Sequence, residues 1–172
     1  MRVVAGELKG RTLTAPSGRD VRPTSDRARE ALFSILGDVA GLDVLDLYAG
    51  TGALAIEALS RGAATATLVD LDAGTARANV AALGLEDRAQ VVGADVLEFL
   101  RSTGPDYDLI LCDPPYRLAA RLGPDLDPLM RSRLRPGGSI VVESSARGPL
   151  DLDLEPWRER RYGEALLRVY RP

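Results

Sequence analysis

The sequence predicts an α/β fold with a Rossmann-like arrangement, in which helices cover both faces of a mostly parallel seven-stranded sheet. Three observations predict it. Short apolar runs alternate with helix-like segments from residue 42 onward, four of these runs are closed by an aspartate, and the last two runs are separated by a short connection. Alternation of this kind is typical of βαβ units, whose strands are buried on both faces. The 172 residues fit one such domain.

The first 20 residues differ from the rest of the chain. Two short strand-like runs, at 2–5 and 11–14, are followed by Pro16 and Gly18, which interrupt regular structure. Thr24 is the expected N-cap of a helix to about Leu36, because apolar residues recur on one face of that segment. We therefore divide the chain into two parts. Residues 1–22 are a basic N-terminal extension with small strand and helix elements, and residues 23–172 are an α/β domain.

The remaining elements follow in chain order. We expect strands at 42–47, 65–69, 89–92, 107–111, 139–142, 157–161 and 165–170, and helices at 53–60, 73–83, 96–101 and around 125–133. The connection across Gly163 is too short for a crossover, so the last two strands must pair antiparallel and give the sheet an antiparallel C-terminal strand. We interpret Trp157 as a core or strand residue, and the alternating run 150–154 as a loop or edge strand facing solvent.

Composition excludes several chemistries. The chain has no histidine and a single cysteine, Cys112, so Ser-His-Asp and Cys-His nucleophiles and Cys/His zinc sites cannot be built. We expect no bound metal, no internal disulfide, a cytoplasmic location and no membrane association, since no apolar stretch approaches the length of a membrane span. The net charge is −3, yet residues 1–29 carry +4. This asymmetry favours contact with a polyanion about as much as a solvated arm without a partner.

Four aspartates close consecutive apolar runs: Asp46, Asp70, Asp95 and Asp113. The carboxyl ends of parallel strands meet at one edge of the sheet, where open α/β folds bind ligands, so these side chains are expected to share one cleft. Aspartate is also a common helix N-cap, which would explain Asp70 and Asp95 without any ligand. It explains Asp46 and Asp113 less well, because each lies within a more specific motif.

The first motif is Asp46-Leu47-Tyr48-Ala49-Gly50-Thr51-Gly52. With Ala55 and Asp70 it fits the glycine pattern of dinucleotide-binding loops, whose glycines let the backbone approach a ligand. A carboxylate four residues before the glycines would repel a pyrophosphate, whereas it suits an ammonium or sulfonium cation. The motif therefore favours a cationic cofactor that carries a ribose, and a nicotinamide enzyme is the weaker alternative.

The second motif is Asp113-Pro114-Pro115-Tyr116. Its prolines fix the backbone and remove N–H donors, so the loop is stiff and presents carbonyl oxygens. Asp113 and the Pro114 carbonyl could accept the two protons of an –NH2 group and direct the nitrogen lone pair at an electrophile. Tyr116 offers a ring on which a nucleobase could stack. An ordinary proline-rich turn is the alternative interpretation.

Together the motifs resemble class I S-adenosylmethionine-dependent methyltransferases, and within that group the RsmD-type family, which methylates guanine N2 in 16S ribosomal RNA. The resemblance covers nearly the whole chain. Besides the two motifs it includes residues 2–6 with Gly10-Arg11, the run 22–33 that begins Arg22-Pro23-Thr24, and the run 50–63 with Glu57-Ala58-Leu59-Ser60-Arg61-Gly62-Ala63.

The resemblance implies S-adenosylmethionine as the cofactor. It assigns cofactor contacts to Arg22, Thr24, Asp46, Tyr48, Gly50, Thr51, Gly52, Asp70, Leu71, Asp95 and Val96. It assigns the target guanine to the catalytic residues Asp113, Pro114, Pro115 and Tyr116. For the RNA we expect contacts from Arg2, Lys9, Arg11, Arg19 and Arg29. The implied partner is 16S ribosomal RNA, in the 30S subunit or an assembly intermediate, and the enzyme is expected to act as a monomer.

Other functions share part of this evidence. Enzymes that methylate adenine N6 in DNA or a protein glutamine also use an Asn/Asp-Pro-Pro-Tyr motif, although no second domain for duplex DNA is visible in this chain. A non-catalytic RNA-binding assembly factor could keep the fold without the reaction. Intact motifs argue against that alternative.

Overall fold

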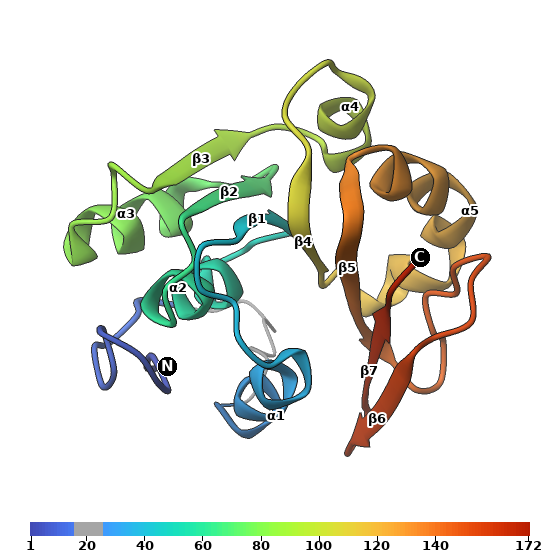
Figure 1. Cartoon of the computed structure of the whole chain (residues 1–172), viewed down its shortest axis with the longest axis horizontal. Helices are drawn as coiled ribbons and strands as arrows, with labels where there is room; N and C mark the ends of the chain where they lie inside the picture. The colour runs from blue at the N-terminus through green and yellow to red at the C-terminus, as the bar shows by residue number, and fades with distance from the viewer. Residues whose placement is uncertain (16–25) are drawn as a thin grey trace.

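The computed structural model describes residues 1–15 and 26–172 and confirms the α/β prediction. Figure 1 shows one twisted sheet with strand order β3-β2-β1-β4-β5-β7-β6. The five strands from β3 to β5 run parallel, and β7 pairs antiparallel with both β5 and β6. The strands are β1 (Asp43–Leu47), β2 (Thr65–Asp70), β3 (Ala89–Gly93), β4 (Tyr107–Cys112), β5 (Leu134–Ser145), β6 (Arg158–Tyr162) and β7 (Ala165–Tyr170).

Helices cover both faces of the sheet, because its strands are apolar on both sides. One core unites the sheet with helices α1 to α3, and a second unites it with α4 and α5, an arrangement that can be followed in Figure 1. The helices are α1 (Asp26–Leu36), α2 (Ala53–Ser60), α3 (Gly74–Leu83), α4 (Val96–Arg101) and α5 (Tyr116–Ser132). The predicted N-cap Thr24 lies outside the described residues.

Three expectations about the second half of the chain need correction. Helix α5 begins at Tyr116, well before residue 125, and continues through Pro124 and Pro128. The run 150–154 is a loop with Asp151 and Asp153 exposed, as expected, but its leucines do not face solvent, because Leu150 and Leu152 are buried in the second core. Trp157 lies just before β6 and is 40% exposed, so it is neither a core nor a strand residue.

Residues 1–15 fold back on the domain instead of extending from it. The two expected strands shrink to one antiparallel bridge, Arg2 with Thr12, closed by a hydrogen bond from the Leu13 N–H to the Met1 carbonyl. Val3 and Leu13 are buried in the first core, beside α1 and α2. The apolar side chains of this segment are therefore part of the domain's own core.

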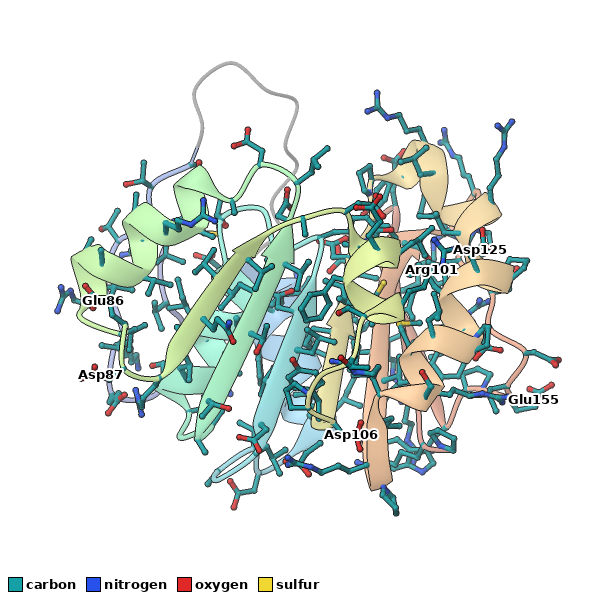
Figure 2. The ribbon with its side chains drawn as sticks, turned by 90° about the horizontal axis from the view of Figure 1, so that it is seen from above. Glu86, Asp87, Arg101, Asp106, Asp125 and Glu155 are labelled. Atoms are coloured by element: carbon teal, nitrogen blue, oxygen red, sulfur yellow. The ribbon has the colours of Figure 1, made fainter. Side chains whose placement is uncertain are left out.

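The sheet places the aspartate motifs on one edge. Figure 2 shows the parallel strands side by side, with Asp106, immediately before β4, at their amino ends. At the opposite edge β1 and β4 are neighbours, and Leu47 is in register with Cys112. Both motifs therefore start from adjacent strand ends.

Candidate functional site

The glycine loop turns sharply from β1 into α2. Tyr48, Gly50 and Gly52 all have positive φ, at 60°, 55° and 78°. Glycine adopts this backbone without strain, whereas Tyr48 does so at a cost, and such strain is concentrated at functional sites. A Cβ on Gly52 would lie 2.7 Å from the Cδ2 of Leu68. The loop therefore requires glycine at position 52 for both conformation and space.

Asp46 is buried beneath this loop, with 1% of its surface exposed. Its Oδ2 accepts a hydrogen bond of 3.0 Å from the backbone N–H of Ala55, in the first turn of α2. Burial raises the pKa of Asp46 to about 7, and the nearby Asp70 acts in the same direction. A cation placed beside this carboxyl group would offset its desolvation, so the site fits a positively charged ligand.

Asp70 fixes the other side of the loop. Its Oδ2 accepts from the Gly50 N–H at 2.8 Å, and its Oδ1 accepts from the Asp72 N–H at 2.9 Å. Each carboxylate oxygen can accept more than one hydrogen bond. Asp70 therefore holds the glycine loop and keeps capacity for a second pair of donors, such as the hydroxyls of a ribose.

Apolar surface adjoins Asp70. Leu71 is 80% exposed, an unusual environment for a large aliphatic side chain, and it provides a face for a flat ring. Asp95 follows β3 and caps α4, because its Oδ1 accepts from the N–H groups of Leu97 and Glu98 at 2.9 and 3.0 Å. Val96 is buried. The N-cap alternative is thus confirmed for Asp95, without excluding a ligand contact.

The Asp113–Tyr116 motif begins directly beside the glycine loop. The backbone N–H of Asp113 donates to the Leu47 carbonyl over 3.3 Å. Pro114 is buried and Pro115 is exposed, while Asp113 and Tyr116 are partly exposed. Cys112 is fully buried, and burial raises the pKa of its thiol, so it is no nucleophile. The site thus joins a buried carboxyl group, Asp46, to a stiff, polar turn.

The sequence did not predict a role for Asn79 on α3. This polar side chain is buried, with 2% of the residue's surface exposed. Its side-chain Nδ2 donates to the carbonyls of Thr51 and Thr14, at 2.9 and 3.0 Å, and its Oδ1 accepts from the Thr14 N–H at 2.8 Å. One amide therefore links the glycine loop to the end of the N-terminal segment. A single asparagine in a helix has no sequence signal that reveals this role.

Glu57 on α2 is a second residue that sequence analysis left without a role. Its carboxylate accepts the backbone N–H groups of Val4 and Ala5, at 2.7 and 2.9 Å. It also pairs with Arg61 at 2.8 Å and with Arg29 at 3.5 Å. The resemblance included Glu57 and Arg61 in one run, and the structure gives that run a physical task, because it holds the N-terminal segment.

Arg29 does not fit the role predicted for it. Its side chain is completely buried and pairs with Asp26 and Glu57, so it cannot reach an RNA phosphate. Arg2, Lys9 and Arg11 are exposed, as an RNA contact requires. Three further predicted residues lie outside the described part of the chain: Arg19, Arg22 and Thr24.

Two hollows lie at the opposite edge of the sheet. The larger, of about 430 Å³, includes Asp43, Thr65 and Asp106, and the smaller, of about 290 Å³, includes Val39 and Pro136. Both are remote from the aspartate motifs. Within residues 1–15 and 26–172, no group of three acidic or cysteine side chains is placed to hold a metal ion. None of the described helices has the length and apolar character of a membrane span.

Comparison with known proteins gives consistent matches. The family model described as Conserved hypothetical protein 95 matches residues 1–171. Ribosomal RNA small subunit methyltransferase D of Escherichia coli K12 is 35% identical, over 99% of this chain and 89% of that protein. The protein of the same name from Haemophilus influenzae is 31% identical, over 99% and 93%. The solved structure of yhhF from Escherichia coli superposes with a TM-score of 0.87 at 34% identity, over 99% of this chain and 97% of that one.

Proposed function

Because the chain belongs to the family of ribosomal RNA small subunit methyltransferase D, a group of class I S-adenosylmethionine-dependent methyltransferases, we propose that it methylates the exocyclic N2 amine of a guanine in 16S ribosomal RNA. The reaction would occur in the 30S subunit or an assembly intermediate. The proposal extends the family assignment to one nucleobase and one atom.

One contact supports this proposal most directly. The hydrogen bond from the Asp113 N–H to the Leu47 carbonyl joins the amine-binding motif to the strand that carries Asp46. Methyl transfer requires the acceptor nitrogen within roughly 3–3.5 Å of the methyl carbon, in line with the departing sulfur. A direct backbone link between the two motifs limits how far the two reactants could drift apart.

The residues present fit the cofactor. The positive charge of the cofactor would offset the cost of burying the Asp46 carboxylate. Asp70 would accept hydrogen bonds from the ribose hydroxyls, and Leu71 would cover one face of the adenine. Tyr48, Gly50, Thr51 and Gly52 would line the methionine portion, with Asp95 and Val96 near the adenine. Arg22 and Thr24 would close the site from the preceding segment. When bound, the cofactor supplies an electrophilic methyl group on sulfur.

The chain's task is then to orient the amine. Asp113 and the Pro114 carbonyl would each accept one N–H of the guanine N2 group, leaving the nitrogen lone pair free to form the new N–C bond as the S–C bond breaks. The methylated amine carries one excess proton, which Asp113 or water accepts. Tyr116 would stack on the base, which must leave any base pair to reach the site.

The experiment that tests this proposal compares Asp113→Ala with Asp106→Ala, an acid at the opposite end of the same strand (Figure 2). We expect Asp113→Ala to lower turnover on small subunits at least a hundredfold while cofactor and RNA affinities stay within a few-fold. Asp106→Ala should retain full turnover. RNA-dependent function that survives Asp113→Ala would favour a non-catalytic assembly factor and contradict the proposal.

A further inference from the structure

The chain has a second basic segment, at its C-terminal end. Residues 157–172 contain five arginines and two glutamates, a net charge of +3 in a protein whose total is −3. Together with the +4 of residues 1–29, this leaves −10 on residues 30–156. Positive charge is thus concentrated in two segments far apart in sequence.

Arginines on β6 have no acidic partner in the described structure. Arg158, Arg160 and Arg161 are exposed and donate only to nearby backbone carbonyls, of Trp157, Glu159 and Gly163. Both glutamates of the segment are already neutralised, Glu159 by Arg168 and Glu164 by Arg147. The strand therefore presents positive charge that nothing among the described carboxylates balances.

An aromatic ring extends this surface at one end of β6. Trp157 is 40% exposed, and the guanidinium groups of Arg158 and Arg171 lie 4.5 and 3.7 Å from its ring centroid. Stacking of arginine on tryptophan orders the guanidinium without neutralising it, so less entropy is lost when that group binds an anion. We define the basic edge as Trp157, Arg158, Arg160, Arg161 and Arg171.

The register of the sheet relates the basic edge to the methylation site. Arg161 is opposite Leu166, which is opposite Ser144 on β5, two residues beyond the partner of Cys112. Arg161 is therefore separated from Cys112, the residue before Asp113, by three interstrand spacings and by two residues along the strand direction. These offsets place the two Cα atoms roughly 16 Å apart. The N-terminal segment contacts Asn79 on α3 and Arg88 just before β3, whereas β6 is the edge strand on the other side of β1 and β4, as can be followed in Figure 1. The two basic segments therefore flank the site.

We propose that the basic edge binds the phosphate backbone of the RNA substrate and, with the N-terminal segment, holds the RNA on both sides of the target base. This inference rests on the proposed RNA methylation. Arginine guanidinium groups bind phosphates with two parallel hydrogen bonds. At roughly 16 Å from Cys112, the basic edge would contact phosphates a few nucleotides away from the target base. A base that must be flipped out benefits from backbone contacts on both flanks.

Charges on an edge strand also prevent strand-to-strand aggregation, and this alternative must be separated from RNA binding. Protection of an edge needs charge of either sign, whereas phosphate binding needs positive charge. Charge reversal therefore discriminates between them. Arg160→Glu with Arg161→Glu keeps the edge charged but would repel RNA.

The test measures binding of protein-free 16S ribosomal RNA and methyl transfer to small subunits. We expect the double Glu variant to lose at least tenfold in RNA affinity with unchanged cofactor affinity. Arg160→Gln with Arg161→Gln should lower the slope of log affinity against log salt by about 1.4 to 1.8, the loss of two phosphate contacts. The control, Arg101→Glu with Arg131→Glu, changes net charge equally at exposed positions on α4 and near the end of α5, away from Tyr116, and should have little effect.

Several results would overturn the inference. The Glu variant could bind RNA like the wild type, or the control could lose as much affinity. Loss of activity on assembled subunits with unchanged affinity for protein-free RNA would instead assign the basic edge to a ribosomal protein. The proposed function fails separately, if the wild-type protein transfers no methyl group to RNA at all.

Discussion

The side-chain amide of Asn79 donates a hydrogen bond to the Thr51 carbonyl over 2.9 Å and thereby connects α3 to the glycine loop. The same amide binds both backbone groups of Thr14, the last part of the N-terminal segment before residues 16–25. A buried side chain thus supports two parts of the proposed site at once, the loop under the cofactor and the start of the segment that carries Arg22.

Leucine is nearly the same size as asparagine but makes no hydrogen bonds, so Asn79→Leu tests whether the amide supports Thr51 and Thr14. Asn79→Leu leaves two carbonyls and one N–H without partners, so we expect a loss of about 1–3 kcal/mol in the free energy of unfolding. Because Asn79 acts through Thr51, KM for the cofactor should rise more than kcat falls. Gln90→Leu, which changes an exposed amide on β3, is the control. Equal effects of the two variants would contradict a specific role for Asn79.

Glycine substitutions separate backbone strain from crowding in the loop. Gly52 and Gly37 have similar positive φ values, 78° and 82°, but only a Cβ at position 52 meets a neighbour within 4 Å. Gly37→Ala should cost about 1 kcal/mol of stability from strain alone. Gly52→Ala should cost clearly more and weaken cofactor binding, both measurable by denaturation and calorimetry. Similar stabilities for the two variants would show that Leu68 yields without cost.

The buried Asp46 predicts a pH dependence. Its pKa in the folded protein is about 7, raised from 3.8, so the folded state binds more protons than the unfolded state between these values. Its contribution to stability is present below pH 3.8 and is lost as the pH rises through 7. Relative to the wild type, Asp46→Asn should therefore gain stability between pH 4 and 7 in denaturant titrations. A constant difference across this range would contradict burial of an ionisable Asp46.

The same carboxyl group should make cofactor binding depend on pH. A cation pairs with the ionised form, so the affinity for S-adenosylhomocysteine, whose ammonium is positive, should increase up to about pH 7 and then level off. In Asp46→Asn the affinity should be lower and nearly independent of pH. Calorimetry from pH 5 to 8 checks both, and parallel curves for the two proteins would exclude Asp46 as the group responsible.

Glu57 should be required for the docking of residues 1–15. Glu57→Ala leaves Arg29 buried without its partner on α2 and frees the N–H groups of Val4 and Ala5. We expect a loss of about 3–5 kcal/mol and faster tryptic cleavage after Lys9 and Arg11. Glu30→Ala, an exposed acid on α1, should change neither. Unchanged cleavage in Glu57→Ala would mean that contacts other than those of Glu57 hold the segment.

The positions of the strands near the site followed from local patterns, because apolar runs and closing aspartates repeat regularly from Asp46 to Asp113. Helix α5 was harder to predict. Pro124 and Pro128 each remove a backbone donor and so disfavour one continuous helix, but Ala119, Leu126 and Met130 pack into the second core along the whole helix. Tertiary burial there outweighs the lost backbone hydrogen bonds.

The polar contacts inside the fold could not be predicted. Asn79, Glu57 and Arg29 are polar residues in helices, a position in which most such side chains face water. Their roles depend on the N-terminal segment folding back over α2 and α3, a non-local event without a sequence period. For the same reason Arg29 was assigned to RNA although it is buried, whereas the exposed arginines of β6 were not assigned.

The most direct test of the proposed function identifies the product. Small subunits from a strain that lacks this protein are incubated with the enzyme and methyl-labelled S-adenosylmethionine, and the RNA is digested to nucleosides for mass spectrometry. The proposal predicts labelled N2-methylguanosine, formed by the wild type and not by Asp113→Ala. Label in N6-methyladenosine or in protein, or no transfer by an enzyme that still binds the cofactor, would contradict guanine N2 as the acceptor.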